Sequence, residues 1–236
     1  MRSSRSSSPS ASWSSATPEN RPGRRSTLRR PQRLAALLEA IATTDPAPAS
    51  GSAAAAVVAA SAALVEKCAL LSTEHWTGAP GAGARAHDLR LHAEELIELD
   101  VHAYLEYVAA RRAVRGLREN DRARVIGPAL ARTVDVPLDV VRSAAEVVKI
   151  AAELARRGNP NLRADAVVAA ILAAAAAASA VTLIRANLGP GTRDLRLAEA
   201  RRLSRAAGAR AGRLASPGPT GGRGRAPARS RDSGRR

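Results

Sequence analysis

A cluster of polar residues interrupts an alanine-rich part of the chain at Gly158-Asn159-Pro160-Asn161, and Asp165 follows a few residues later. Local signals give this turn a structural explanation. Gly158 can take the left-handed position that ends a helix, while Asn159 caps the next helix and Pro160 opens it. Asp165 then interacts with the positive end of that helix. The same arrangement also gathers carboxamides, a carboxylate and free N–H groups, which suits a polar heterocycle or an anion.

A second carboxylate stands among apolar residues. Leu96, Asp100, Tyr104 and Tyr107 are spaced so that they share one face of a helix. Partial burial among Leu and Tyr would raise the pKa of Asp100 and prepare it to act as a general acid or base. The alternative is that Asp100 lies in water at the edge of this stripe.

A third candidate is the segment Asp45–Ala56, DPAPASGSAAAA. Its two prolines keep the chain extended, Gly51 permits close approach of another group, and Ser52 can cap the helix that follows. The simpler interpretation is a linker followed by a helix cap. Asp88 and His92 have the spacing of a metal-binding pair, but no further ligand completes a site, so we predict no metal.

The elements that must position these residues are helices. Strand patterns are nearly missing and helical periodicity recurs, which predicts an all-α fold with long antiparallel helices in a single domain of residues 31–215. The prolines and glycines divide the domain into segments. We expect helices at about 32–42, 50–72, 84–117, 123–134, from about Pro137 to Gly158, from there to Asn187, and at 193–215.

The net charge of +16 belongs to the two ends of the chain. Residues 1–33 carry +7 and residues 201–236 carry +10, which leaves −1 for residues 34–200. The segments 1–30 and 216–236 are rich in Ser, Arg, Gly and Pro, a composition typical of disorder. We therefore expect disordered basic tails, and no nucleic-acid binding beyond nonspecific contacts of these tails.

Compartment and membrane signals are few. Cys68 is the only cysteine, which fits a reducing compartment, and the first 30 residues contain no apolar signal segment, so we expect a cytoplasmic protein. The uncharged run Val167–Ile184 has 18 residues, nine of them alanine. Charged residues flank it closely, which favours a buried core helix over a membrane span.

The three candidate segments together resemble one family, the formiminotetrahydrofolate cyclodeaminases and methenyltetrahydrofolate cyclohydrolases. The segment PAPASGSAAAA resembles the family's Pro-Ala-Pro-Gly-Gly-Gly-Ser-Ala-Ala signature, and LDVHAYLEYVAA resembles its Asp-x-x-Ala-Tyr/Phe helix. Residues 135–188 resemble its succession of Val-Pro-Leu, Gly-Asn-Pro-Asn, Ser-Asp and Arg-x-Asn-Leu. The resemblance covers about residues 33–190, in order and in spacing.

The resemblance implies an all-helical homodimer that closes or opens the methenyl bridge between N5 and N10 of tetrahydrofolate. It implies Asp100 and Asp165 as the acid/base groups. Binding of the folate substrate would fall to the residues at three helix ends, Gly51, Ser52, Asn159, Asn161, Arg185 and Asn187. The reaction would be either a cyclodeaminase (lyase) or a cyclohydrolase (hydrolase) reaction, with a tetrahydrofolate derivative as substrate and no tightly bound cofactor.

Two alternatives remain open at this stage. Ala49 and Ser50 stand where the family has glycines, and Ala164 stands where it has the serine before Asp165. A non-catalytic helical dimer of the same fold, acting as a binding or scaffold module, fits these replacements. A nucleic-acid-associated protein acting through its tails is the other alternative, although the chain has few aromatic residues for stacking.

Overall fold

The computed structural model describes residues 31–216, and no strand occurs within them. The all-α prediction is therefore confirmed for this part of the chain, and the predicted disorder of the tails falls on residues 1–30 and 217–236, outside the described residues. The α-helices and one 3₁₀ turn follow in the order α1 (Pro31–Ile41), α2 (Ser50–Leu70), α3 (Ala79–Ala113), α4 (Glu119–Arg157), η1 (Pro160–Leu162), α5 (Arg163–Leu188) and α6 (Leu195–Ala215).

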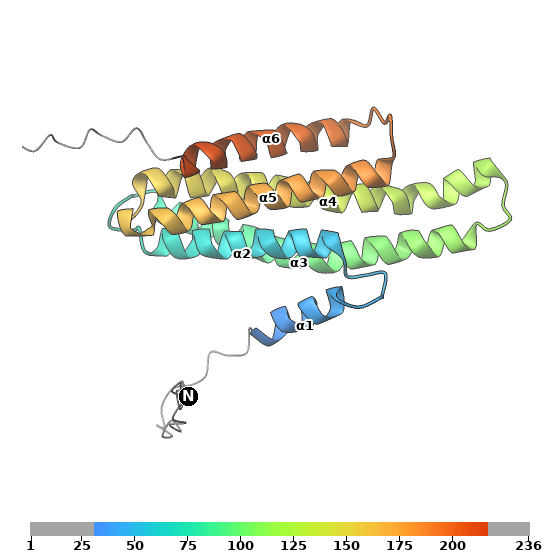
Figure 1. Cartoon of the computed structure of the whole chain (residues 1–236), viewed down its shortest axis with the longest axis horizontal. Coiled ribbons are helices and arrows are strands. Elements are labelled where there is room, and N and C mark those ends of the chain that lie inside the picture. The colour runs from blue at the N-terminus through green and yellow to red at the C-terminus, as the bar shows by residue number, and fades with distance from the viewer. Residues whose placement is uncertain (1–30, 217–236) are drawn as a thin grey trace, which may run out of the picture.

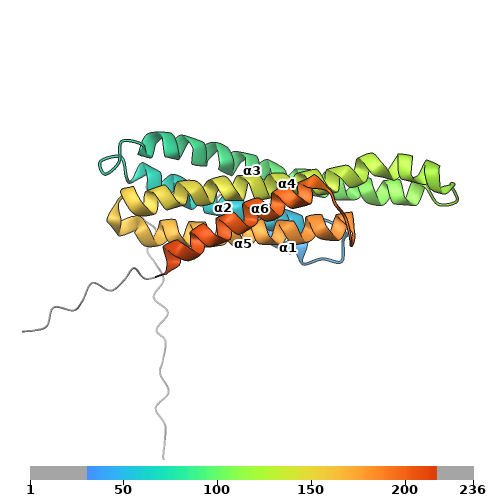
Figure 2. The same cartoon turned by 90° about the horizontal axis from the view of Figure 1, so that it is seen from above.

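The helices form one bundle around α4, which packs against α2, α3, α5 and α6. Figure 1 and the view from above in Figure 2 show these helices running alongside one another, with the hairpin of α3 and α4 extending beyond the others at one end. α1 stands apart from the other helices in Figure 1. Because α2 and α5 also contact each other, the bundle brings the start of α2 close to the end of α5.

The core is built from alanine and valine. The buried positions of α5 are seven alanines and Ile184, at intervals of three and four residues, and α2 buries Ala55, Val58, Ala62 and Val65. Such small side chains allow helix axes to approach closely, and close packing of this kind gives the interior its density. The alanine-rich helix is thus a half-buried element of the bundle.

Two helical segments within residues 31–216, Ser50–Leu70 and Pro160–Leu188, are long and apolar enough to cross a membrane by length and composition alone. In each of them, 44% of the most apolar window is buried inside the bundle. Buried core helices commonly reach this level of apolarity.

Two helix boundaries differ from the prediction. One helix was expected to end at about residue 134 and the next to begin at about Pro137, but α4 is continuous from Glu119 to Arg157 and contains both Pro128 and Pro137. Each proline removes one backbone donor, and the packing of α4 along its neighbours maintains the helix through that loss. α3 begins at Ala79, before the expected start, because Pro80 occupies the first turn, where a helix tolerates proline.

Candidate functional site

A pocket of about 190 Å³ lies where α2 begins and α5 ends. The linker between α1 and α2 forms one of its walls through Pro46, Ala47 and Ala49. The remaining walls come from α2, α3, α4 and α5, through the residues Ser50, Gly51, Asp100, Ala103, Tyr104, Thr133, Pro137, Leu183 and Asn187. Four segments that are distant in the sequence therefore meet at one end of the bundle, and three predicted site residues, Gly51, Asp100 and Asn187, are among the residues that line the pocket.

Asp100 is held at the start of α2. The hydroxyl of Ser52 donates a hydrogen bond of 2.9 Å to Asp100 Oδ2. Gly51 provides the space for this contact, because a Cβ at that position would overlap the Asp100 carboxylate. The predicted close approach at Gly51 is thus confirmed, and the approaching group is a side chain of the protein itself.

Ser52 does not cap α2, contrary to the prediction. It lies inside the first turn, and the N-cap residue Ala49 makes no side-chain hydrogen bond. Alanine has no side-chain oxygen that could accept a hydrogen bond from the first turn of α2. The carboxylate of Asp100, which comes from α3, takes this role near the positive end of α2. Sequence spacing within one segment gave no sign of a partner from another helix.

The environment of Asp100 changes its acidity. Burial raises the pKa of the Asp100 carboxyl above its ordinary value, and the hydroxyl and backbone N–H of Ser52 partly oppose this rise. The expected desolvation of Asp100 is therefore confirmed. A carboxyl with a raised pKa holds its proton nearer to neutral pH, which is the property that a general acid requires.

The side chain of Asn187 forms a hydrogen bond with a backbone carbonyl of α4 that Pro137 leaves without its usual donor. Its side-chain Nδ2 donates a hydrogen bond of 2.7 Å to the carbonyl oxygen of Thr133. In a regular helix this carbonyl would accept from the backbone N–H of residue 137, but Pro137 has none. The carboxamide of Asn187 therefore replaces a missing helical hydrogen bond, and its Oδ1 atom remains for a ligand in the pocket.

Tyr104 and the linker residues are parts of the pocket that were not predicted as site residues. Tyr104 lies one helical turn after Asp100 and is 40% exposed. Its position on the same face as Asp100 was visible in the sequence, but its place in a cavity depended on the approach of α4 and α5. Arg185 is exposed on α5, two residues before Asn187, and is not among the residues that line the pocket.

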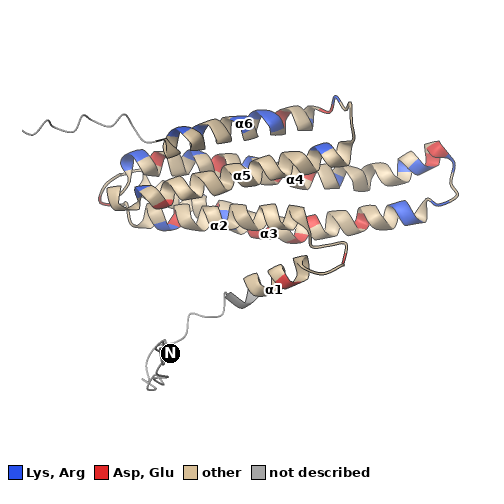
Figure 3. Cartoon of the chain, viewed as in Figure 1, with Lys and Arg blue, Asp and Glu red and all other residues tan. Residues whose placement is uncertain are grey.

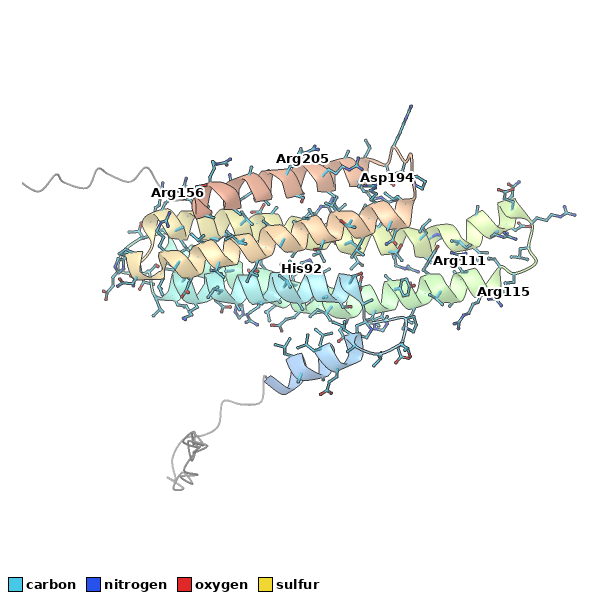
Figure 4. All side chains as sticks on the ribbon, in the orientation of Figure 1. His92, Arg111, Arg115, Arg156, Asp194 and Arg205 are labelled. Carbon is cyan, nitrogen blue, oxygen red and sulfur yellow. The ribbon has the colours of Figure 1, made fainter. Side chains whose placement is uncertain are left out.

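The Gly158–Asn161 turn and Asp165 lie at the other end of the bundle. Figure 4 labels Arg156, just before the turn, and Asp194, just after α5, at opposite ends. Asp165 and Asn187 both belong to α5, and 22 residues of helix separate them by about 33 Å. Asp100 and Asp165 consequently do not face one cavity within a single chain.

The turn is explained by its own hydrogen bonds. Asn159 accepts a hydrogen bond from the backbone N–H of Asn161 at 3.0 Å, and its Nδ2 donates to the carbonyl of Leu71 at 3.2 Å. The predicted cap at Asn159, with Pro160 opening the short helix, is confirmed. Asn161 is exposed, and the Asp165 side chain is 42% exposed with Lys67 at 3.9 Å.

Gly158 does not take the predicted left-handed conformation. Its φ angle is −77°, and glycine is needed there for space, since a Cβ would come within 2.7 Å of Ser72 Oγ and of the Leu154 carbonyl. The hydroxyl of Ser72 donates to the carbonyl of Cys68 and accepts from the backbone N–H of Asn159, which ties the turn to the end of α2.

No metal-binding cluster of three or more His, Cys, Asp or Glu residues occurs between residues 31 and 216. His92 instead lies 3.8 Å from Glu95 on the same exposed side of α3, and Figure 4 shows it away from both ends of the bundle.

Comparison with known proteins extends this description. The protein-family description "Formiminotransferase-cyclodeaminase" matches residues 33–203. A formiminotetrahydrofolate cyclodeaminase of Thermotoga maritima has a similar structure, with a TM-score of 0.64 and 22% sequence identity over 75% of this chain and 92% of that chain. No curated protein sequence matches. The structural likeness concerns the fold, whereas the family match covers most of the bundle and all of the pocket.

Proposed function

Because this chain belongs to the formiminotransferase-cyclodeaminase family, we propose that it is a folate-dependent one-carbon enzyme that closes or opens the methenyl bridge of tetrahydrofolate. The observation that carries the proposal is the position of Asp100. Its half-buried carboxyl, with a raised pKa, is fixed by Ser52 at the mouth of a pocket that also contains Asn187.

The proposed chemistry requires one group that both gives and accepts a proton. In the cyclodeaminase direction N10 attacks the formimino carbon, N10 loses its proton, and the nitrogen of the formimino group leaves as ammonia after gaining one. In the cyclohydrolase direction a base removes a proton from the water that adds to the bridge carbon. Asp100 serves both reactions, since its raised pKa favours the protonated form before it donates and makes it a stronger base afterwards.

The other pocket residues are proposed to bind and orient the substrate. Asn187 offers its Oδ1 atom to the heterocycle, and Gly51 borders the bridge carbon at the start of α2. Ser52 was expected to bind the substrate, but it is buried outside the pocket lining and acts by holding Asp100. Arg185 is the proposed contact for the anionic glutamate tail, because it is exposed on the same helix just before Asn187.

The pocket of one chain is small for a whole folate. Its volume of about 190 Å³ is below the range of about 300–1,000 Å³ that is usual for small-molecule sites. We therefore propose that the enzyme is a homodimer. Asn159, Asn161 and Asp165 then contribute to a folate site only from the second copy, because in their own chain they lie at the start of α5, whereas the pocket lies at its end.

The first experiment follows the absorbance of 5,10-methenyltetrahydrofolate and, separately, ammonia release from 5-formiminotetrahydrofolate. Asp100→Asn is expected to lower turnover by about 10²- to 10⁴-fold, the usual contribution of a general acid or base. Asp88→Asn, an exposed aspartate on the same helix outside the pocket, is the matched control and should retain full activity.

Both variants are first compared with the wild type by circular dichroism. Full activity of a folded Asp100→Asn variant would contradict the assigned role. Absence of turnover by the wild type with both substrates would favour the second candidate, a non-catalytic dimer of the same fold, for which the alanine at position 49 is the supporting replacement.

A further inference from the structure

The last helix, α6, carries a run of arginines that belongs to the folded bundle. Residues 201–216 contain five arginines and no acidic residue. The five are Arg201, Arg202, Arg205, Arg210 and Arg213, of which all but the half-buried Arg210 are exposed. In Figure 3 blue recurs along α6. The sequence analysis counted these arginines with the basic C-terminal segment, whereas they lie on a helix that packs against α4 and α5.

The acidic residues of α6 are already occupied by other arginines. Arg142 of α4 donates to both carboxylate oxygens of Glu199, at 2.9 and 3.0 Å. Asp194, which caps α6, pairs with Arg196 at 2.7 Å. The five arginines of residues 201–213 form no ion pair with any carboxylate among residues 31–216. Their charge therefore remains available to an anionic partner.

The arginines occupy the sides of α6 that face away from the bundle. The buried residues of α6, which mark its inner side, are Leu197, Ala200, Ala207 and Ala211. At 3.6 residues per turn, Arg202, Arg205 and Arg213 lie opposite these residues, and we call these three arginines the outer face. Arg201 and Arg210 lie on the two flanks between the inner side and the outer face. Figure 4 labels Arg205 on the side of α6 away from α5.

Small residues separate the arginines. Ala206, Gly208, Ala209 and Gly212 are exposed, and Leu195 at the first position is the one large apolar side chain exposed within Leu195–Ala215. A helix that binds a membrane surface inserts several apolar side chains, and a protein interface has an apolar or aromatic centre. The surface of α6 instead suits a partner that offers negative charge and lets the helix backbone come close.

The dimensions of α6 match the major groove of B-form DNA. An α-helix with its side chains is about 10–12 Å across, and this groove is about 12 Å wide. Figures 1 and 2 show α6 on the outside of the bundle. From Arg202 to Arg213 the outer face is about 16 Å long, or about half a helical turn of DNA. Arginines on both flanks then lie beside the phosphates of the two strands that border the groove.

The flank of Arg210 opens into a hollow of about 370 Å³ between α3, α4 and α6. The basic residues of this hollow are Arg85, Lys149, Arg156 and Arg210. Its two carboxylates, Glu146 and Glu153, pair with Lys149 and Arg156. Four positive and two negative charges leave a surplus of two positive charges, so this side of α6 can accept the phosphates of one strand.

We propose that α6 binds the major groove of double-stranded DNA through phosphate contacts that do not depend on base sequence. Phosphates position a protein on the duplex but carry no sequence information. The sequence analysis expected nucleic-acid contacts from the terminal segments alone, whereas this surface belongs to the bundle. α6 contributes no residue to the pocket that contains Asp100, so the inference does not depend on the reaction proposed there.

The binding is tested with the full chain by fluorescence anisotropy of a labelled DNA duplex of about 20 base pairs, or two helical turns. The variant Arg202→Gln/Arg205→Gln/Arg213→Gln removes the outer face, and glutamine preserves helix propensity. At about 100 mM salt we expect its affinity to fall by about 10- to 100-fold. Because each phosphate contact contributes about 0.9 to the slope of log K against log salt, the loss of three contacts should reduce this slope by about 2.7.

The matched control is Arg111→Gln/Arg112→Gln/Arg115→Gln. It removes the same charge from exposed positions of the hairpin between α3 and α4, which Figure 4 shows far from α6. The control should bind DNA as the wild type does. With an RNA duplex, whose major groove is deep and narrow, the control and the outer-face variant should bind alike, because α6 cannot enter.

Four results would overturn the proposal. The first is a wild type that does not bind the DNA duplex at about 50 mM salt. The second is an outer-face variant that binds DNA as tightly as the control, which would assign binding to the terminal segments. The third is an equal loss of affinity for RNA, and the fourth is binding to phosphatidylserine vesicles in place of DNA. Circular dichroism shows whether each variant is folded, and none of these measurements involves folate.

Discussion

Asp100 combines two features that oppose each other. Burial favours its protonated form, whereas the start of α2 and the Ser52 hydroxyl favour its carboxylate. The balance leaves the pKa above the ordinary value, so the group changes its protonation state closer to neutral pH than an exposed aspartate does. At neutral pH the acid and base forms of this side chain are therefore closer in free energy than those of an exposed aspartate.

This balance makes stability depend on pH in a defined direction. Since the folded pKa of Asp100 lies above its unfolded value, its contribution to stability is fully present below the unfolded pKa and is lost as pH rises through the folded pKa. Asp100→Asn keeps an oxygen acceptor for Ser52 and removes the charge. We expect this variant to be more stable than the wild type to urea at pH 8, with a difference that shrinks toward pH 4.

The matched control for this measurement is Asp165→Asn. The Asp165 side chain is 42% exposed, so its replacement should change stability little across the same pH range. An Asp100→Asn variant that is less stable than the wild type at pH 8 would contradict this prediction. It would show that the interaction of the carboxylate with the start of α2 stabilises the fold by more than its burial destabilises it.

At the level of the helices, α4 contains two prolines and still forms one continuous element. The carbonyl freed by Pro137 belongs to Thr133, and Asn187 from α5 supplies the donor that it lacks. The missing backbone hydrogen bond in α4 is therefore replaced by a side chain of α5, and Thr133, Pro137 and Asn187 all line the pocket. The position of Asn187 is fixed by helix chemistry before any ligand binds.

A double-mutant cycle measures this link. Asn187→Leu leaves the Thr133 carbonyl unpaired and should cost about 1–3 kcal/mol of unfolding free energy. In a Pro137→Ala background the backbone N–H of residue 137 restores the helical bond, so the same Asn187→Leu change should cost about 1 kcal/mol less. Unfolding in urea gives the four free energies, and strictly additive values would contradict the proposed replacement of one donor by another.

The helices themselves could be predicted from local sequence, and their interruptions could not. The bounds of α1, α2 and α6 agree with the expected ones to within about two residues, because apolar periodicity and flanking Gly, Pro and Ser are local signals. Pro137 was expected to begin a helix, since the compensating Asn187 lies 50 residues further along the chain. Gly158 was assigned a special φ angle, whereas its requirement is space beside Ser72.

On the scale of the molecule, the direction of α5 separates the predicted site residues. α5 runs from the Gly158–Asn161 turn to the pocket, so it holds Asp165 at one end of the bundle and Asn187 at the other. Motif order along the chain cannot reveal this, because helix length and pairing decide which motifs meet. Of the residues predicted from the sequence, Asp100, Gly51 and Asn187 lie together in the pocket. Asn159, Asn161 and Asp165 were assigned to the same site, but they can reach a pocket only if it belongs to a second copy of the chain.

An experiment that mixes two variants tests whether Asp165 of a second copy completes the site that contains Asp100. In the proposed dimer, Asp100→Asn and Asp165→Asn chains are each inactive, but a mixed dimer keeps one site with both aspartates. Refolding the two variants together in equal amounts should therefore restore about one quarter of the wild-type activity, as random pairing predicts. An Asp165→Asn variant that is fully active alone would assign the chemistry to Asp100 without Asp165.

The linker wall of the pocket has a consequence for how this protein can evolve. Pro46, Ala47 and Ala49 shape the pocket, yet they precede α2 and belong to none of the helices that bury the core. Substitutions and insertions there are therefore expected to change the shape of the pocket while the buried contacts between the helices stay as they are. The shape of this pocket can therefore vary between related chains through changes in a short peptide segment, without loss of the helical core.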